Sequence, residues 1–325
     1  MRRPSVNCLP VLVAVLLCAT PQLVGAAVGD TPPRFEVPAS TPEAPLTFVM
    51  YGDTRFSKRD DIANAVARRA LVGKITSEKP AAIFIGGDLV YAGSNPDDYE
   101  TYKSETVEWS NQGIPVFLAL GNHEFAGCPH DVTPCLNNWW KAADPYAPRP
   151  YRWYSVTLGS TALALILDSD SALKPGSEQR EWFERQISAA DARIQFLLIV
   201  LHYPPVRDPF YPSMRDETEI VRYLSKKAGS LHARIVVVGS HVHNYERYKR
   251  GGVTYLVSGG GGAKPVPAVR MFGELSRLRT AVNFHYLRFV LNNDRLLATM
   301  VRFEADDVEG NRWTEPDRFE VRARN

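Results

Sequence analysis

The sequence predicts an α/β fold whose sheet is parallel in part, and two observations carry this prediction. Between residues 46 and 124, short apolar runs alternate with stretches of helical periodicity, which is the pattern of strand–helix–strand units with parallel strands. Further along the chain, apolar runs follow one another with little sequence between them, which indicates hairpins and antiparallel strands. We therefore expect a mixed sheet whose faces are covered by helices.

The expected elements can be placed by residue number. Short apolar or β-branched runs predict strands, and an apolar spacing near 3.6 residues predicts helices. Two of the runs meet at Gly159 and Ser160, which predicts a hairpin turn there. The expected strands are 46–53, 81–88, 114–124, 152–159, 161–169, 194–205, 233–238, 252–257, 282–291 and 295–303. The expected helices are 60–75, 97–112, 177–190 and 217–228.

Residues 1–26 have the pattern of an export signal. Two arginines at positions 2 and 3 precede an apolar core over residues 9–19, and small residues at 24–26 precede an expected cut before Ala27. The apolar core is shorter than a membrane span requires, so we expect no stable membrane anchor. These features predict a secreted or periplasmic protein.

A lipoprotein attached through Cys18 is the alternative, although Leu17 stands where such signals have a small residue. Residues 27–45 include five prolines and predict a linker of low structure. Residues 46–325 remain for one domain, which is long enough to bury a sizeable core.

Charge and cysteine content narrow the classes of partner. The chain has 38 Lys and Arg against 36 Asp and Glu, so it has no polybasic character and no nucleic-acid partner is evident.

Two of the four cysteines lie in the export signal, and Cys128 and Cys135 remain. In an oxidising compartment these two can form a disulfide. The alternative is a metal site with His130 and Asp131, for which no second Cys/His cluster completes a tetrahedral set.

Polar side chains follow five of the expected strands at their carboxyl ends, the edge where α/β sheets bind ligands. Carboxylate, imidazole and amide groups are metal ligands, and two ions about 3.5–4 Å apart can clamp a phosphoryl group and activate a water. His241 and His243 would face the same side of an extended segment. Taken singly, such residues can be caps, turns or surface groups, as we expect for His130, His232 and His285. The residues at the strand ends are Asp53, Asp88, Tyr91, Asn122, His123, Glu124, His202, His241 and His243.

At these positions the sequence resembles the calcineurin-like metallophosphoesterases, and among them most closely the purple acid phosphatases. The segments "GD" (52–53), "GGDLVY" (86–91), "GNHE" (121–124) and "GSHVHNYER" (239–247) follow the family's order between residues 46 and 263. Tyr91, three residues after Asp88, resembles the metal-binding tyrosine of the purple subgroup. The resemblance implies two mixed β-sheets packed face to face and flanked by helices. Because only a short linker precedes Asp53, we expect no counterpart of the large N-terminal sandwich domain of the plant enzymes.

The resemblance implies a centre of two metal ions. A tyrosine ligand suits a hard trivalent ion, so Fe³⁺ is expected in one position and Zn²⁺, Mn²⁺ or Fe²⁺ in the other. The first ion's implied ligands are Asp53, Asp88, Tyr91 and His243. The second ion's implied ligands are Asn122, His202 and His241, with Asp88 bridging both ions.

The expected reaction is hydrolysis of a phosphoester, most simply a monoester, by a hydroxide that the metals generate. His123 would stabilise charge or protonate the leaving oxygen, with Glu124 orienting its ring. The substrate contacts expected are Arg55, Asn122, His123 and Tyr203. Two alternatives stay open: a phosphodiesterase or nucleotidase on the same core, and a secreted protein that binds metal or phosphate without catalysis.

Three positions depart from the family pattern. Arg55 stands where relatives have His or Gly, and it would contact either phosphate or a surface acid. Ser240 stands where the family usually has a glycine before His241. Tyr203 follows His202 at a position where other members often have another residue. The glycine run 259–262 precedes Lys264 but lacks the Ser/Thr and helix of a nucleotide P-loop, so we expect it to form a flexible rim of the site.

Overall fold

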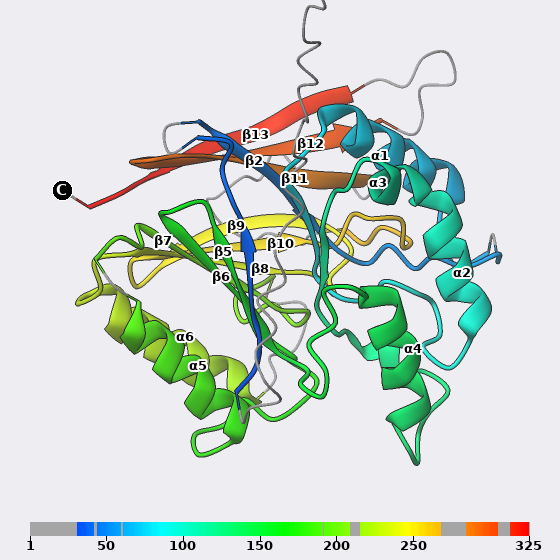
Figure 1. Ribbon diagram of the computed structural model, residues 1–325, viewed down its shortest axis with the longest axis horizontal. Helices are drawn as coiled ribbons and strands as arrows, with labels where there is room; N and C mark the ends of the chain where they lie inside the picture. The colour runs from blue at the N-terminus through cyan, green and yellow to red at the C-terminus, as the bar shows by residue number, and fades with distance from the viewer. Residues whose placement is uncertain are drawn as a thin grey trace, which may run out of the picture. The chain divides into compact units, whose positions relative to one another are not determined.

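Two β-sheets packed face to face form the centre of the computed structural model (Figure 1). The structure describes residues 31–41, 44–59, 61–190, 192–208, 215–267, 284–304 and 313–324. The expected export signal lies outside these residues. None of the helices in the described ranges combines the length and the apolar character that crossing a membrane demands.

The six-stranded sheet has the order β13-β12-β11-β2-β3-β4. Strands β2, β3 and β4 run parallel to one another, while β11, β12 and β13 are added antiparallel to their neighbours. The bounds are β2 (Leu46–Tyr51), β3 (Ala82–Ile85), β4 (Val116–Leu118), β11 (Phe284–Asn292), β12 (Arg295–Phe303) and β13 (Trp313–Arg322).

The seven-stranded sheet has the order β1-β5-β6-β7-β8-β10-β9. Strands β6, β7, β8 and β10 run parallel, and β5 and β6 form the expected hairpin around Gly159, whose φ is +55°. The bounds are β1 (Arg34–Val37), β5 (Tyr154–Leu158), β6 (Ala162–Ile166), β7 (Phe196–Val200), β8 (Arg234–Gly239), β9 (Tyr245–Arg250) and β10 (Val253–Ser258).

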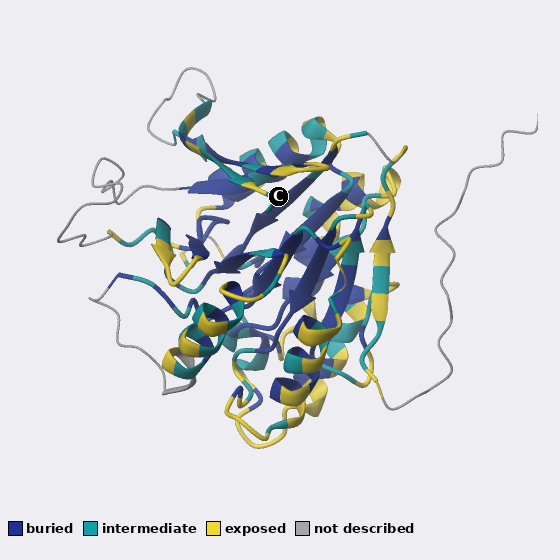
Figure 2. Ribbon diagram, turned by 90° about the vertical axis from the view of Figure 1, so that its left-hand side faces the viewer, coloured by how far each residue is buried: buried dark blue, intermediate teal, exposed yellow. Residues whose placement is uncertain are grey.

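Helices cover the outer face of each sheet, so the arrangement has four layers (Figure 1). The six-stranded sheet packs against α1 (Ala65–Glu78), α2 (Pro96–Glu105), α3 (Val107–Asn111) and α4 (Thr133–Ala143). The seven-stranded sheet packs against α5 (Glu178–Ala189) and α6 (Arg215–Ala228). Figure 2 shows buried strands in the middle and exposed outer faces on the helices.

Strand alternation explains why the core has several layers. On β2, Phe48 and Met50 lie between the two sheets, while Val49 and Tyr51 face the helices on the outside. Both faces of the strand are therefore apolar, which is typical of strands covered on both sides. Phe48 stacks on Phe289 of β11 with ring centroids 5.2 Å apart. The expected fold class, two mixed sheets flanked by helices, is confirmed.

The expected linker contains a strand that the sequence analysis did not predict. Residues 34–37 form β1, which pairs with β5 in parallel register at the edge of the seven-stranded sheet. Phe35 packs edge-on against Tyr146 and Tyr154. Prolines lie on both sides of β1 but not within it, and an edge strand tolerates them because one row of its N–H groups stays unpaired.

Candidate metal centre

Two sets of strand ends meet where the sheets face each other. In the six-stranded sheet, β2 and β3 lead to Asp53 and Asp88, and β4 leads to the 3₁₀ helix η1 (Asn122–Phe125). In the seven-stranded sheet, β7 leads to His202 and β8 to residues 241–243. The carboxyl ends of the parallel strands thus bring the predicted residues to one place, as is usual for ligand sites in α/β sheets.

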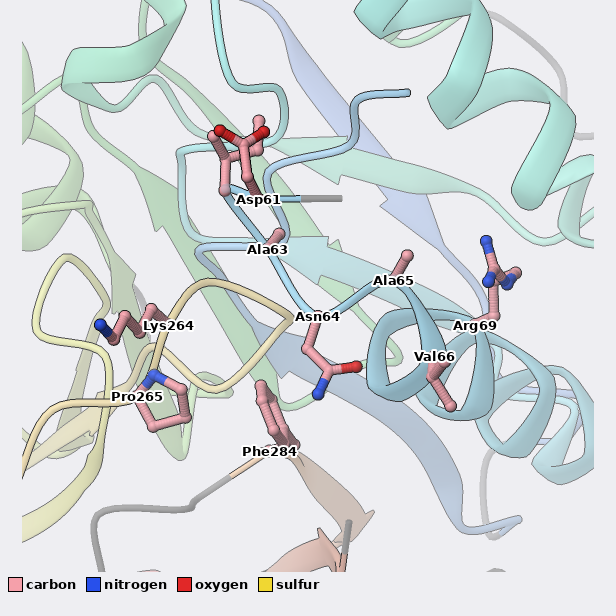
Figure 3. Close-up of a pocket in the computed structure, with 10 residues that line it drawn as sticks. Asp61, Ala63, Asn64, Ala65, Val66, Arg69, Lys264, Pro265 and Phe284 are labelled. Atoms are coloured by element: carbon pink, nitrogen blue, oxygen red, sulfur yellow. The ribbon is translucent and has the colours of Figure 1, made fainter. Parts of the chain in front are cut away.

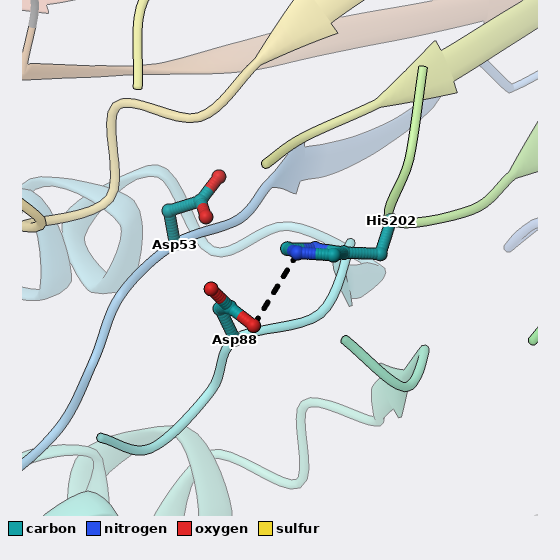
Figure 4. Close-up of side chains that lie close together, drawn as sticks. All are labelled: Asp53, Asp88 and His202. Carbon is teal, nitrogen blue, oxygen red and sulfur yellow. Dashed lines mark ion pairs between the residues drawn. The ribbon is translucent and has the colours of Figure 1, made fainter. Parts of the chain in front are cut away.

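Asp53, Asp88 and His202 form the tightest group. Each offers one ligand atom, and the three atoms lie within 4.8 Å of one another. All three side chains are fully buried. Figure 4 shows the two carboxylates and the imidazole converging from separate segments of the chain.

Further electron-pair donors surround His202. Its Nε2 lies 3.3 Å from Oδ1 of Asp88, 3.2 Å from Oδ1 of Asn122 and 3.2 Å from Nδ1 of His241. Its other ring nitrogen, Nδ1, lies 3.0 Å from the carbonyl oxygen of Gly86, so we assign the ring proton to Nδ1. Nε2 then presents a lone pair toward carboxylate and amide oxygens. A bound cation stabilises such a group of lone pairs.

Asp53 and His243 form the other half of the cluster. Nε2 of His243 lies 3.4 Å from Oδ1 of Asp53, while its Nδ1 lies 2.9 Å from the carbonyl oxygen of Lys264. Within the described ranges, neither carboxylate oxygen of Asp53 accepts a hydrogen bond of normal geometry, and Oδ1 has the long 3.4 Å contact with His243. A buried carboxylate without such partners is costly, and a cation placed between these atoms removes the cost. The donor set therefore fits metal ions.

Charges in the cluster are strongly coupled. Burial opposes ionisation of Asp53, but His243, His202 and Arg55 outweigh it and lower the pKa of Asp53 to about 2. Burial and the neighbouring His202 lower the pKa of His241 to about 4. Burial lowers the pKa of His243, but Asp53 raises it more, so the net direction is upward. A proton and a metal ion thus compete for the place between His243 and Asp53.

The backbone around the cluster is strained. Among the described residues, five that are not glycine have positive φ, and four of these lie at the cluster. Each left-handed residue with a side chain costs on the order of 1–2 kcal/mol, and such strain collects at functional sites. The four are Asp53 (57°), Arg55 (47°), Asp88 (53°) and His241 (64°).

His241 and His243 do not lie in an extended segment, which corrects the expectation from the sequence. Strand β8 ends before His241, and residues 241–244 form bends. The positive φ of His241 is incompatible with an extended strand. The bend, rather than strand alternation, directs His241 toward His202 and His243 toward Asp53.

The ring of His123 lies at the accessible edge of the cluster, with the side chain 18% exposed. Its Nδ1 lies 2.6 Å from the carbonyl oxygen of Tyr91, so that carbonyl orients the ring. The backbone N–H of His123 donates to Oδ1 of Asp88 at 2.9 Å, and its Nε2 lies 3.9 Å from Oδ2. His123 thus faces the same carboxylate as His202 and Arg55.

Glu124 does not orient His123, contrary to the expectation. Its carboxylate is fully buried and accepts backbone N–H groups of Gly121 at 2.6 Å, Leu89 at 2.8 Å and Asp88 at 2.9 Å. Burial and the neighbouring Asp88 raise the pKa of Glu124 to about 8, while the N–H groups of Gly121 and Asp88 oppose the rise. Glu124 therefore fixes the turn that carries Asp88.

Tyr91 lies beside the cluster. Its ring centroid is 5.4 Å from that of His123, and the guanidinium of Arg59 lies 5.2 Å above it. No hydrogen bond among the described residues joins its hydroxyl to Asp53 or Asp88. Its role as a ligand stays a prediction.

Arg55 and Tyr203 border the cluster from different segments. Nη2 of Arg55 lies 3.3 Å from Oδ2 of Asp88, so its partner is a buried cluster residue and the surface-acid alternative is wrong. The ring of Tyr203 lies edge-on to His241, with centroids 4.4 Å apart. The Tyr203 hydroxyl donates to Oδ1 of Asp170 at 3.4 Å, and burial raises the pKa of this phenol.

Residues 46–259 match the family model described as calcineurin-like phosphoesterase. The chain belongs to this family. It is 23% identical over 248 residues to probable purple acid phosphatase 20 of Arabidopsis thaliana, covering 68% of this chain and 57% of that protein. It is 24% identical over 226 residues to purple acid phosphatase 22 of the same plant, covering 66% and 48%. The chain thus spans about half the length of these relatives.

Solved structures share the calcineurin-like fold. The purple acid phosphatase PPD1 from yellow lupin has a TM-score of 0.68 at 18% identity, covering 86% of this chain and 54% of that one. GAP50 of Plasmodium has a TM-score of 0.58 at 15% identity, covering 86% and 90%. A dimetal phosphatase from Danio rerio has a TM-score of 0.57 at 13% identity, covering 86% and 99%.

Ser240, which departs from the calcineurin-like pattern, fits because two glycines face it. A Cβ atom on Gly52 would lie 2.2 Å from Oγ of Ser240, and one on Gly86 would lie 2.4 Å away. The Ser240 hydroxyl donates to the carbonyl of Ser258 at 3.2 Å. The serine therefore fills space that the glycines leave open, and both following histidines keep their places.

The glycine run 259–262 is buried, so the expected flexible rim is wrong. A Cβ atom on Gly259 would lie 2.5 Å from Oδ2 of Asp53, and the N–H of Ala263 donates to the carbonyl of Asp53 at 2.9 Å. Glycine is needed because the backbone approaches the carboxylate closely. The run therefore packs against Asp53 of the candidate cluster.

A hollow of about 470 Å³ is lined in part by residues that follow this run (Figure 3). It lies between the start of α1 and residues 264–265, and its lining includes Asn64, Lys264 and Phe284. Asn64 caps α1, which explains why the helix begins after it rather than at residue 60.

The cysteine alternatives are settled by the geometry. Cys128 and Cys135 form a disulfide, so the metal site with His130 and Asp131 is excluded. His130 and His232 are exposed. His285 is buried and lies 3.1 Å from the hydroxyl of Ser258 through its Nε2.

Sequence reasoning assigned no role to the end of the motif "GSHVHNYER". The Tyr245 hydroxyl donates to Oδ2 of Asp317 at 2.6 Å, and Nε of Arg247 donates to the same oxygen at 2.8 Å. Glu246 accepts the N–H of Asp208 at 2.7 Å. These contacts tie the histidine-bearing bend to β13 and to the loop after His202. Their partners lie far away in sequence, so no local signal reveals them.

Proposed function

We propose that the protein hydrolyses phosphate monoesters at a centre of two metal ions. The observation that carries the proposal is the cluster itself, where buried electron-pair donors from both sheets face one another and the oxygens of Asp53 accept no hydrogen bond of normal geometry in the described ranges. The match to the calcineurin-like phosphoesterases supports ester hydrolysis as the reaction. The purple acid phosphatases among its relatives support a monoester as the substrate.

The contacts divide the donors into two groups, one for each ion. The first group is Asp53, His243 and, by the family resemblance, Tyr91. The second group is Asn122, His202 and His241, with Asp88 between the two groups. A phenolate oxygen in the first group favours Fe³⁺, and the second group suits Zn²⁺, Mn²⁺ or Fe²⁺. When bound, two such ions supply Lewis-acid activation and a water of lowered pKa.

His123 is the proposed proton donor to the leaving oxygen. The Tyr91 carbonyl holds Nδ1, so Nε2 is the atom that gains and loses a proton. This atom lies at the accessible edge, 3.9 Å from Oδ2 of Asp88, within reach of an ester held at the cluster. The substrate contacts proposed beside it are Arg55, Asn122 and Tyr203.

Assays on the metal-loaded protein test this function. The protein should hydrolyse 4-nitrophenyl phosphate with a higher kcat/KM than bis(4-nitrophenyl) phosphate, and chelation should abolish both activities. His202→Ala should lower kcat/KM by roughly 100-fold or more, because it removes a buried ligand. His232→Ala is the matched control, since this histidine is exposed. Protein that retains two ions and turns over neither ester contradicts the proposal.

Two alternatives give different results in the same assays. A higher kcat/KM for the diester would identify a phosphodiesterase, and selective cleavage of nucleoside monophosphates a nucleotidase. The fold alone does not decide for an enzyme, because GAP50, described as an anchor in the inner membrane complex of Plasmodium, shares it. Metal-loaded protein that binds phosphate without turnover would be a binding protein.

We also propose that the protein acts outside the cytoplasm, secreted or periplasmic. The support is the signal-like pattern of residues 1–26 and the Cys128–Cys135 disulfide, because disulfides persist in oxidising compartments. N-terminal sequencing of the exported protein should find Ala27 first. A chain that retains residues 1–26 contradicts cleavage, and a lipid on Cys18 identifies the lipoprotein.

A further inference from the structure

Arg55 is a cation built against the metal cluster. Its Nη2 lies 3.3 Å from Oδ2 of Asp88, and its side chain is 17% exposed. Its Nε is buried and has no hydrogen-bond partner in the described part of the chain. Because a guanidinium carries five N–H donors, the one contact to Asp88 leaves donors for a ligand.

The two carboxylate oxygens of Asp88 have different neighbours. Oδ1 accepts the N–H of His123 at 2.9 Å and faces Nε2 of His202 at 3.3 Å. Oδ2 lies between Nη2 of Arg55, at 3.3 Å, and Nε2 of His123, at 3.9 Å. Arg55 and His123 therefore flank one oxygen, next to the atoms that would bind the metals.

Backbone contacts fix the position of Arg55. Its N–H donates to the carbonyl of Asp88 at 3.0 Å, and its own carbonyl accepts from Nη1 of Arg68 at 3.4 Å. Arg68 is itself buried and paired with Glu105 at 2.7 Å. The residue keeps a φ of 47°, a conformation that persists only where the surroundings impose it. These contacts fix the backbone, and the contact of Nη2 with Asp88 holds the guanidinium, so less entropy is lost when a ligand binds.

We propose that Arg55 makes the site selective for phosphate monoesters over diesters. The inference rests on the proposed hydrolysis at the same cluster. A monoester near neutral pH carries close to two negative charges and three terminal oxygens, whereas a diester carries one charge and two such oxygens. The additional charged, hydrogen-bonding oxygen matches the donors that Arg55 has left, since guanidinium and phosphate form charge-assisted hydrogen bonds.

Three variants of the metal-loaded protein test the role of Arg55. Arg55→Ala should lower kcat/KM for 4-nitrophenyl phosphate by roughly 10- to 100-fold. The decrease in kcat/KM for bis(4-nitrophenyl) phosphate should be several-fold smaller. Arg55→Lys keeps the charge and should recover part of the selectivity. Lys58→Ala is the control. It also removes one positive charge, three residues after Arg55, but the Lys58 side chain is 74% exposed. It should change neither value.

Metal content and phosphate binding separate the outcomes. Arg55→Ala should keep its metal content and bind inorganic phosphate roughly 10-fold or more weakly, while binding of dimethyl phosphate changes less. An equal loss for monoester and diester overturns the inference, and so does a loss of metal in both the Ala and the Lys variant. If the wild-type protein turns over neither ester, the proposed function has failed. The two binding measurements then still test the selectivity of Arg55.

Discussion

His202 places its Nε2 atom 3.3 Å from Oδ1 of Asp88, although the two residues follow strands of different sheets. The carbonyl of Gly86, two residues before Asp88, holds the other ring nitrogen at 3.0 Å. One short segment of the chain thus provides both a carboxylate and the group that orients its imidazole neighbour. The candidate metal centre depends on the packing of the two sheets, because its residues come from both of them.

His123 offers a test of proton transfer. His123→Ala should lower kcat for a monoester by roughly 10²- to 10⁴-fold, because the leaving oxygen loses its proton donor. Metal content should not change, since the ring orients on the Tyr91 carbonyl. The decrease in kcat should be smaller for esters whose leaving group is a weak base, because such a group leaves without being protonated. An equal loss for good and poor leaving groups would show that His123 does not act as an acid.

Glu124 offers a test of structure rather than chemistry. Glu124→Ala leaves at least three buried N–H groups without an acceptor, and each costs about 1–3 kcal/mol. Urea unfolding should show a loss of about 3 kcal/mol or more. Glu124→Gln keeps one acceptor oxygen and should lose less. Full stability of the Ala variant would contradict the assignment of Glu124 to the Asp88 turn.

Tyr91 offers a spectroscopic test of the metal pair. A tyrosinate bound to Fe³⁺ gives a violet colour by charge transfer, so the iron-loaded protein should be violet and Tyr91→Phe colourless. Iron content, measured by elemental analysis, is the control that the colour was lost with the ligand and not with the ion. A colourless wild-type protein that contains Fe³⁺ would remove Tyr91 from the ligand set.

Asp168, which lies outside the candidate metal centre, should make the stability of the fold depend on pH. Burial raises the pKa of this carboxyl to about 6, against the lowering effect of Arg152. Because the folded pKa lies above the unfolded one, the folded state binds the proton more tightly, and stability falls as pH rises from about 4 to 6. The gap corresponds to at most about 3 kcal/mol. The unfolding free energy of the wild type minus that of Asp168→Asn should therefore decrease as pH rises through this window. A difference that stays constant with pH would contradict the raised pKa.

Periodicity made the central strands and most helices predictable. Strand β2 is apolar on both faces, and α5 begins where Ser177 caps it, so each carries its own local signal. The missed strands β1, β9 and β13 lie at sheet edges, where polar residues replace apolar ones. An edge strand forms because a neighbour offers hydrogen bonds, and the sequence of the strand alone does not show this.

The residue types at the candidate site were predictable, but the groups that position them were not. Asp53, Asp88 and His202 stand at strand ends that a linear reading already finds. The carbonyls that orient the imidazoles are backbone atoms, which any residue supplies, so sequence carries no trace of them. Glu124 shows the opposite case. A glutamate next to His123 suggested a role in catalysis, but in the fold its carboxylate accepts backbone N–H groups instead.

Metal stoichiometry tests the central claim most directly. Elemental analysis of purified, metal-reconstituted protein should find two ions per chain in the wild type. Asp88→Asn, which keeps the shape of the side chain but removes the charge between the two groups of donors, should retain one ion at most. Asp97→Asn, a change on the exposed start of α2, should retain both. A wild-type chain that binds one ion or none after reconstitution, or an Asp88→Asn variant that still binds two, would contradict the dinuclear centre.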